Sequence, residues 1–308
     1  MPMKSPGKSP GKSPGKSPGK SNARISLGAC ARGHAQDYAR ALRLLLGGLA
    51  LAIASNFNLV RAQESAEAKP VELTKLYEPR EYVGKSGEPL KYRLIKPVDY
   101  KFGKKYPLVL FLHGAGERGD DNAATLRHAA KDFSDPQTRS KFPAYVVIPQ
   151  CPTGKKWSEV DWSKDSSELP EEPSDPMKSI KELIDDMVEN AGVDPNRIYI
   201  TGLSMGGYGT WDAIARYPGF FAAAAPICGG GDPKTVEKFK SLPIWCFHGA
   251  KDPVVKAIRS REMIDALQKV GSNAKYTEYP EAQHDSWTQT YSNPELFDWM
   301  FAQRRESK

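Results

Sequence analysis

The feature that most constrains the fold is an alternation of two hydrophobic periods along residues 90–304. Short, nearly continuous apolar runs predict strands that are buried on both faces. Between the later runs, apolar residues recur every three to four positions, which predicts amphipathic helices. Strands are expected at 90–95, 107–113, 144–149, 197–202, 220–227, 243–247 and 274–279. Helices are expected at 180–190, 206–216, 257–270 and 295–304.

Strands that alternate with helices form βαβ units, in which each helix crosses back over the sheet. The sequence therefore predicts an α/β fold with a mostly parallel central sheet and helices on both faces, in a single domain over 63–308. Two longer irregular segments, 114–122 and 154–176, each follow a predicted strand. Open α/β sheets bind ligands beyond the carboxyl ends of their strands, so we expect the functional site near these segments.

The first 62 residues differ in composition from the rest of the chain. They hold ten Lys or Arg and one acidic residue, whereas the remaining residues hold 34 basic and 36 acidic ones. The net charge of +7 therefore belongs to this leader, and the charge of the folded part does not indicate nucleic-acid binding. Residues 1–39 carry a KSPG repeat that cannot bury a core, so we expect them to be disordered. A basic tail that binds phosphate groups is the alternative.

Residues 40–62 have the layout of a secretory signal peptide. Two arginines precede an apolar stretch at 44–54, and the small residue Ala62 precedes the expected cleavage point before Gln63. The apolar stretch is shorter than the roughly 20 residues that span a bilayer. We therefore expect a secreted or periplasmic protein with no stable membrane insertion after cleavage. An uncleaved amphipathic anchor or a cytoplasmic tail is the alternative.

The chain has four cysteines, of which Cys151, Cys228 and Cys246 lie beyond the leader. A bridge between Cys228 and Cys246 is allowed in an exported protein, and burial as small residues at strand ends is the alternative. No CxxC motif or clustered His/Cys spacing indicates a metal site, so we expect neither metal nor cofactor. The sequence does not indicate an oligomeric state.

A GxSxG motif, Gly202-Leu203-Ser204-Met205-Gly206, lies between a predicted strand and a predicted helix. In this context the serine occupies a strained turn that holds its hydroxyl above the sheet, while the glycines avoid clashes between strand and helix. The first amides of the helix favour negative charge that develops beside the hydroxyl. The motif therefore predicts Ser204 as a nucleophile. A glycine-rich helix start that serves close packing alone is the alternative.

A serine hydroxyl is a weak nucleophile and needs a base that a third group orients. Among the five histidines, His284 follows the last predicted strand, in a loop that can return over the strand ends. Asp252 follows the preceding strand, and Asp232, after an earlier strand, is the alternative acid. We expect His284 to take the serine proton and Asp252 to hold the imidazole in place.

Acyl transfer also needs backbone N–H groups that stabilise an oxyanion. Met205 follows the serine at the helix start, and Ala115 lies in the loop HGAGERG, whose small residues allow close approach of the backbone. We expect the amides of Met205 and Ala115 to form the oxyanion hole. Arg118, in the same loop, either pairs with Glu117 or binds a carboxylate of the substrate.

Trp157 and Trp162 lie in the long segment after the predicted strand at 144–149. They either stack on a sugar or aromatic acyl group or pin the loop to the body of the protein. The remaining histidines are expected to have other roles: His34 in the leader, His113 and His248 in turns that leave strands, and His128 as a surface or packing residue of a helix.

Several blocks occur in a fixed order along the chain: LFLHGAGERGDDN, VVIPQCP, GLSMGGYGTW, APICGGGD, HGAKDPVV and AQHDSW. This set resembles the α/β-hydrolase superfamily, and within it the secreted polyhydroxybutyrate-depolymerase and feruloyl-esterase-like group, also described as phospholipase/carboxylesterase or predicted peptidase. The resemblance covers residues 71–304 and implies the α/β-hydrolase fold.

The resemblance also implies a serine carboxylic-ester hydrolase that acts through an acyl-serine intermediate. Its triad would be Ser204, Asp252 and His284, and its substrate a small-molecule or polymer-linked ester. A serine peptidase of the same fold and a non-catalytic binding member of the fold are the alternatives.

Overall fold

The computed structural model describes residues 72–162, 164 and 166–306. The expected disordered leader, 1–39, and the expected signal peptide, 40–62, lie outside the described residues. The described residues belong to the compact unit Pro70–Lys308. Among the helices of this part, none has the length and apolar character needed to cross a bilayer.

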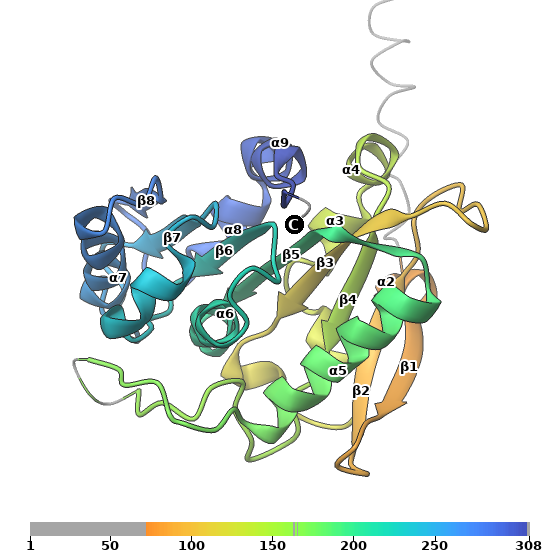
Figure 1. Ribbon diagram of the computed structural model, residues 1–308, viewed down its shortest axis with the longest axis horizontal. Coiled ribbons are helices and arrows are strands. Elements are labelled where there is room, and N and C mark those ends of the chain that lie inside the picture. Colours follow the sequence, from red (N-terminus) through yellow and green to blue (C-terminus); the bar gives the residue numbers. More distant parts are fainter. Residues whose placement is uncertain (1–71, 163, 165, 307–308) are drawn as a thin grey trace, which may run out of the picture. The chain divides into compact units, whose positions relative to one another are not determined.

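An eight-stranded sheet organises the described residues, in the order β1-β2-β4-β3-β5-β6-β7-β8 (Figure 1). The pairs β1–β2 and β2–β4 are antiparallel, and every other pair of neighbouring strands is parallel. The mostly parallel sheet that the sequence predicts is therefore confirmed. The strands are β1 (Glu78–Val83), β2 (Pro89–Ile95), β3 (Tyr106–Leu112), β4 (Tyr145–Pro149), β5 (Val193–Leu203), β6 (Ala223–Ile227), β7 (Trp245–Gly249) and β8 (Lys275–Tyr279).

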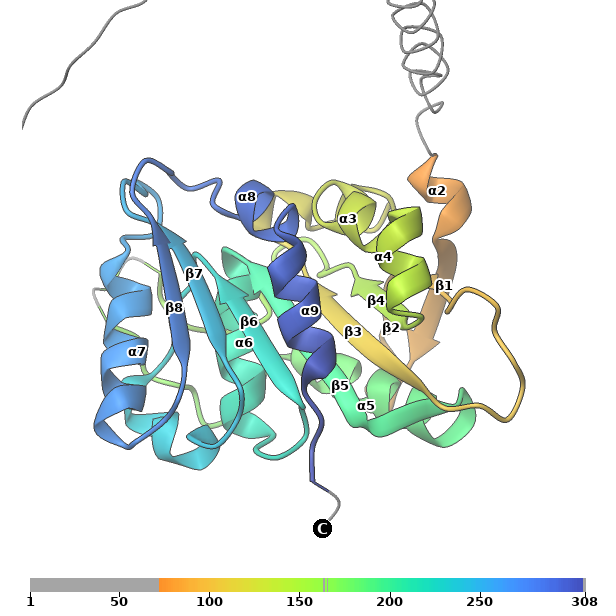
Figure 2. The ribbon, with the colours of Figure 1, turned by 90° about the horizontal axis from the view of Figure 1, so that it is seen from above.

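Helices cover both faces of this sheet (Figure 2). Helices α5, α6 and α7 pack on one face, and α3, α8 and α9 pack on the other. The helices are α2 (Leu73–Leu76), α3 (Ala130–Ser134), α4 (Pro136–Lys141), α5 (Asp175–Asn190), α6 (Met205–Arg216), α7 (Ile258–Lys269), α8 (Trp287–Tyr291) and α9 (Pro294–Ala302). Short 3₁₀ turns are η1 (Ala115–Glu117), η2 (Ala124–Leu126) and η3 (Pro233–Phe239).

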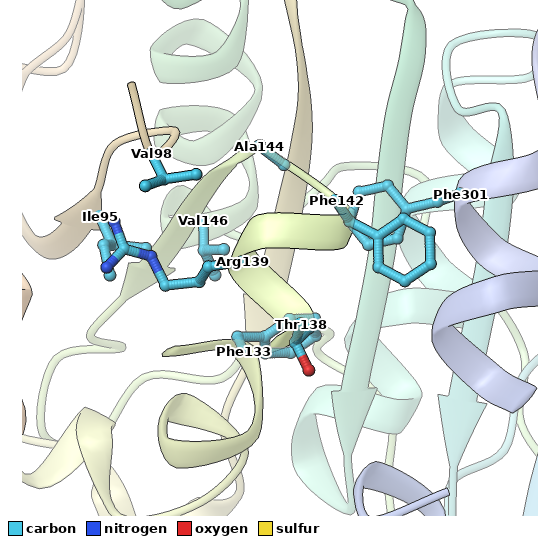
Figure 3. Close-up of a pocket in the computed structure, with 9 residues that line it drawn as sticks. All are labelled: Ile95, Val98, Phe133, Thr138, Arg139, Phe142, Ala144, Val146 and Phe301. Carbon is cyan, nitrogen blue, oxygen red and sulfur yellow. The ribbon is translucent and has the colours of Figure 1, made fainter. Parts of the chain in front are cut away.

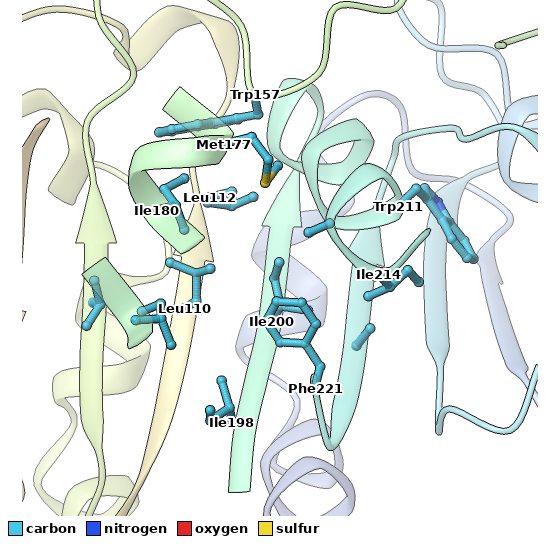
Figure 4. Close-up of a cluster of buried hydrophobic side chains, with 14 of the residues drawn as sticks. Leu110, Leu112, Trp157, Met177, Ile180, Ile198, Ile200, Trp211, Ile214 and Phe221 are labelled. Carbon is cyan, nitrogen blue, oxygen red and sulfur yellow. The ribbon is translucent and has the colours of Figure 1, made fainter. Parts of the chain in front are cut away.

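Strand β3 illustrates why the apolar runs of the sequence are continuous. All seven of its residues are buried. Leu108, Leu110 and Leu112 belong to the hydrophobic cluster under α5 and α6, and Figure 4 shows the latter two. Val109 and Phe111 belong to the cluster on the opposite face. Because side chains alternate across a strand, a strand covered on both sides must be apolar at every position, and each buried Leu or Phe contributes about 2 kcal/mol.

Helices α5 and α6 end at the predicted positions 190 and 216, whereas α7 and α9 end one and two residues before the predicted positions. Helix α5 begins at Asp175, five residues before the predicted helix, because Ser174 caps it by accepting a hydrogen bond from Met177 N at 3.2 Å. The short helices α3, α4 and α8 were not expected, since segments of five or six residues do not show a helical period. His128 lies in a bend between η2 and α3, so its placement in a helix was wrong.

The turn from β5 into α6 has a conformation that few residues adopt. Ser204 lies between the two elements with φ 53° and ψ −116°. A Cβ atom on Gly206 would lie 1.9 Å from the carbonyl oxygen of Leu112 on β3. A Cβ atom on Gly202 would lie 2.4 Å from the carbonyl oxygen of Gly206. The two glycines therefore let α6 begin directly against the sheet. The Ser204 side chain is left at the carboxyl end of β5.

We expect Gly206→Ala to lower the free energy of unfolding, because the new methyl carbon would overlap the Leu112 carbonyl oxygen. A clash with backbone cannot be relieved by a change of rotamer, so the loss should be about 3 kcal/mol or more. Gly116→Ala is the matched control, since its methyl carbon would meet Arg127 Nη1 at an ordinary 3.9 Å. Denaturant melts measure both variants, and equal stabilities would contradict this explanation of the motif.

Candidate active site

Three side chains from separate loops meet beyond the carboxyl ends of β5, β7 and β8. The Nε2 atom of His284 lies 3.0 Å from Ser204 Oγ. The Nδ1 atom of the same ring lies 2.7 Å from Asp252 Oδ2. With Nδ1–H donating to the carboxylate, Nε2 is free to accept the serine proton. The arrangement can therefore turn a hydroxyl into a nucleophile.

The Asp252 carboxylate is buried and held from several sides. Its Oδ1 accepts hydrogen bonds from Val254 N at 2.8 Å and Val255 N at 2.9 Å. Burial opposes ionisation, but hydrogen bonds from His248, His284 and these two amides hold the pKa of Asp252 well below its usual range. Asp252 is therefore a carboxylate that can stabilise a positively charged imidazole.

Asp232, the alternative acid in the sequence, lies in a different environment. Its Oδ1 accepts from Lys234 N at 2.9 Å and caps η3. Its Oδ2 accepts from Leu169 N at 3.0 Å and so ties down the long loop after β4. The structure brings Asp252 to His284, whereas Asp232 is used to anchor a loop.

The two residues expected to supply oxyanion donors both adjoin Ser204. Met205 is the first residue of α6, and no side-chain cap occupies this helix start. Ala115 follows Gly114, where an added Cβ atom would lie only 3.7 Å from Ser204 Cβ. The loop that carries Ala115 therefore packs against the serine, with little room for larger residues.

Glu117 and Arg118 do not pair with each other, so that part of the expectation was wrong. The carboxylate of Glu117 is buried and accepts from Arg127 Nη1 at 2.9 Å, with His128 Nε2 at 3.7 Å. Arg118 instead donates from Nε to Ala115 O at 2.9 Å and from Nη1 to Lys155 O at 3.4 Å. Each residue therefore braces the loop through a different partner.

Trp157 does not lie where a substrate could stack on it, so its proposed role in substrate binding was wrong. Its side chain is fully buried in the cluster under α5 and α6 (Figure 4). Its Nε1 donates to the carbonyl oxygen of His113 at 2.9 Å. Trp157 therefore pins its loop to β3, which is the alternative that the sequence left open. Trp162 is only partly buried and packs against Tyr208.

Sequence reasoning missed Trp287, which lies beside the candidate base. Its ring centroid is 5.2 Å from that of His284 in an edge-to-face arrangement, and 5.3 Å from that of His128. Trp287 follows His284 by three residues within the block AQHDSW, so the motif itself was the available signal. The indole limits the positions that the His284 ring can take.

The cysteines of the described chain, Cys151, Cys228 and Cys246, are free and buried. The bridge that the sequence allowed is not formed, because Cys228 packs on one face of the sheet and Cys246 on the other. Cys228 Sγ lies within 4.8 Å of ligand atoms of Asp252 and His284. Burial raises the pKa of the Cys228 thiol, so the group beside the triad is neutral.

The small cavity in Figure 3 is not a substrate site. Its volume is about 10 Å³, enough for a single water molecule. It lies near the start of β4, whereas the three side chains of the candidate site lie beyond the opposite ends of the strands. Its lining consists of Ile95, Val98, Phe133, Thr138, Arg139, Phe142, Ala144, Val146 and Phe301.

His113 holds the loop that carries Ala115. Its Nε2 accepts a hydrogen bond from Cys151 N at 2.9 Å, so Nδ1 must carry the proton that it donates to Gly114 O at 2.6 Å. The Gly114 carbonyl and the Ala115 N–H belong to one planar peptide and point in opposite directions. The hydrogen bond from His113 therefore fixes the direction of the Ala115 N–H. Burial lowers the pKa of His113 to about 4, which keeps the ring neutral.

We expect the free energy of unfolding to fall as the pH drops from 6.5 to 4, because the unfolded chain binds a proton at His113 more tightly. The pKa of His113 has the ordinary histidine value of 6.5 in the unfolded chain and is about 4 in the folded protein, so about 3 kcal/mol is present above pH 6.5 and lost by pH 4. His113→Gln keeps an oxygen that can accept from Cys151 N but does not titrate. Denaturant melts across this range should show a shallower pH dependence for the variant, and parallel curves would contradict the assignment.

Comparisons with known proteins agree with this fold. The phospholipase/carboxylesterase family model matches residues 96–293. The chain is 34% identical over 149 residues to "Poly(3-hydroxyalkanoate) depolymerase C" of Paucimonas lemoignei, covering 46% of this chain and 32% of that protein. It is 26% identical over 200 residues to "Probable carboxylesterase SOBER1-like" of Arabidopsis thaliana, covering 61% of this chain and 74% of that protein. The chain thus spans about a third of the length of the depolymerase.

A solved structure is also similar over most of the described chain. The crystal structure of a thermostable esterase superposes with a TM-score of 0.70 at 41% sequence identity, over 76% of this chain and 64% of that chain. The family match covers β3 to β8, the strand–serine–helix turn and the loops that carry Asp252 and His284. The chain belongs to the phospholipase/carboxylesterase family of α/β-hydrolases.

Proposed function

We propose that this protein is a serine hydrolase that cleaves carboxylic esters through an acyl-serine intermediate. The observation that carries the proposal is the hydrogen-bonded chain from Ser204 Oγ through His284 to the buried carboxylate of Asp252, at 3.0 Å and 2.7 Å. The relatives named as a carboxylesterase, an esterase and a polyester depolymerase support an ester as the substrate. Small-molecule and polymer-linked esters both fit this chemistry.

The proposed reaction begins when Ser204 Oγ attacks the ester carbonyl carbon and passes its proton to His284 Nε2. Asp252 stabilises the imidazolium that forms. The N–H groups of Met205 and Ala115 donate to the oxygen that becomes negative. The imidazolium then gives its proton to the leaving alcohol, and water repeats the sequence to release the acid.

Arg118 is a proposed contact for a carboxylate elsewhere on the substrate. Its guanidinium is partly exposed and adjoins the loop of Ala115, to whose carbonyl oxygen it donates. An arginine held in this way is preorganised to recognise an anion. We therefore expect the protein to prefer esters that carry a negative charge near the scissile bond over those that carry none.

We expect Ser204→Ala to reduce hydrolysis of 4-nitrophenyl acetate by at least about 10³-fold, because the variant lacks the hydroxyl that contacts His284 Nε2. The fold should survive, since the change removes one oxygen atom at the edge of the sheet. Initial rates and a thermal melt measure the two effects. A variant that keeps full activity would reject the mechanism.

Two aspartates provide the matched control for this experiment. Asp252→Asn should lower kcat by about 10⁴-fold, because an amide cannot stabilise the imidazolium or fix its tautomer. Asp232→Asn should keep most of the activity, since Asp232 caps η3 and anchors the Leu169 segment. Equal losses in both variants would contradict the assignment of the acid.

We also propose that residues 40–62 act as a cleaved export signal, so that the mature protein is secreted or periplasmic. The support is their order of positive charge, apolar stretch and small residue before Gln63. Mass spectrometry of the protein isolated from its native source should find an N-terminus near Gln63. A mature chain that retains the KSPG repeat would contradict export by this route.

A further inference from the structure

Asp252 contacts a second histidine besides His284. His248 lies in β7 and its side chain is fully buried. Its Nε2 is 3.3 Å from Asp252 Oδ2, the same oxygen that accepts from His284 Nδ1. Nε2 is also 2.8 Å from the carbonyl oxygen of Val255. On the other side of the ring, Nδ1 is 2.7 Å from Ser260 Oγ.

The neighbours of the His248 ring determine where its proton lies. A carbonyl oxygen and an ionised carboxylate can only accept hydrogen bonds, so Nε2 must carry a hydrogen that it shares between Val255 O and Asp252 Oδ2. Ser260 Oγ lies 3.1 Å from Gly229 O as well as near Nδ1. The hydroxyl can donate to either of these atoms, and the hydrogen on Nε2 is required in both cases.

We propose that His248 is a positioning residue, which holds the carboxylate of Asp252 and the adjoining turn so that Oδ2 stays in line with His284. This inference rests on the proposed function of Ser204, Asp252 and His284. The amides of Val254 and Val255 hold Oδ1, while the two imidazole rings hold Oδ2. The contact with Val255 O ties the ring to the same turn that supplies these amides.

The contact with His248 has two consequences for the reaction. It fixes the orientation of the carboxylate, which raises the fraction of molecules with His284 correctly placed. It also withdraws negative charge from Oδ2, so the carboxylate stabilises the His284 imidazolium less than it otherwise would. Loss of the contact should therefore slow the reaction and, at the same time, favour protonation of the base.

Other charged groups near His248 have their own partners. Glu278 on β8 lies opposite His248 in the sheet register. Arg261 on α7 donates to its carboxylate at 2.8 Å and 2.6 Å, and Tyr276 OH donates at 2.6 Å. The hydrogen bond from Arg261 lowers the pKa of Glu278 to about 2, so its charge does not change in the range where the reaction is measured.

The other groups near His284 are either uncharged or paired with other residues. The Cys228 thiol behind the ring is neutral, and Trp287 beside it carries no charge. Asp285 accepts from Thr288 N and Oγ1 at the start of α8. His128 also contacts the Trp287 ring, and its Nε2 lies 3.7 Å from Glu117 Oε1. Asp252 is therefore the charged group in direct contact with both rings.

The test compares His248→Asn with His248→Gln, because the two amides differ in reach. The nitrogen of Gln occupies the place of Nε2 and can donate to Asp252 and Val255, whereas the nitrogen of Asn occupies the place of Nδ1 and faces Ser260. His248→Asn should lower kcat by about tenfold or more with KM unchanged, and move the acid limb of kcat/KM up by about half a pH unit. In His248→Gln, both kcat and the acid limb of the kcat/KM pH profile should lie closer to the wild-type values than in His248→Asn.

Several results would overturn the role of His248. An acid limb of His248→Asn at the wild-type position, or equal losses in both variants, would mean that the ring only fills space. If His248→Asn does not fold, the ¹⁵N shifts of the wild-type ring decide the question, because the proposal requires a protonated Nε2. An unprotonated Nε2 would overturn it.

The same assay separates this inference from the proposed function. Ser204→Ala is measured beside the His248 variants, with 4-nitrophenyl acetate as the substrate. If Ser204→Ala stays active, the hydrolase mechanism fails and the role of His248 fails with it. If Ser204→Ala is inactive and His248→Asn matches the wild type, only the role of His248 fails.

Discussion

The strained backbone of Ser204 is the constraint on which the rest of the site depends. A residue at φ 53° and ψ −116° costs about 1–3 kcal/mol and persists only if its neighbours hold it. Here Ser204 N donates to Ile227 O at 3.0 Å, and Ser204 O accepts from Tyr208 N at 3.1 Å. The close contact between Gly206 and Leu112 leaves no room for a relaxed turn. The parallel sheet thus stabilises a conformation that presents the Ser204 hydroxyl at the carboxyl ends of the strands.

A buried carboxylate forms the second fixed point, since an unpaired charge inside a protein is strongly destabilising. Asp252 satisfies this requirement with two backbone amides and two imidazoles. The turn after β7 and the loop after β8 are therefore held to one group. His113 likewise holds two loops together. Its neutral ring bonds to Gly114 O in the loop after β3 and to Cys151 N in the loop after β4.

The long loop after β4 shows where sequence reasoning met its limit. Its tryptophans suggested a binding surface, yet Trp157 is buried against β3. Arg216 on α6 donates to the carbonyl oxygens of Pro170, Glu171 and Glu172 and so holds the same loop. An amphipathic side chain such as Trp suits both a ligand and a core, and its sequence position does not distinguish them. Trp157 is buried because it packs against α6, a helix that begins more than thirty positions later in the chain.

The sequence by itself determined the main alternation of strands with the long helices, the strand–serine–helix turn and the residues Ser204, Asp252 and His284 as a candidate set. These follow from local hydrophobic period, glycine placement and position at strand ends, which are properties of neighbouring residues. Only the tertiary structure decided that Asp252 meets His284, that Asp232 anchors Leu169 and that Trp157 is buried with its indole N–H on the His113 carbonyl. These contacts join separate segments, and their geometry exists only once the sheet has brought the loops together.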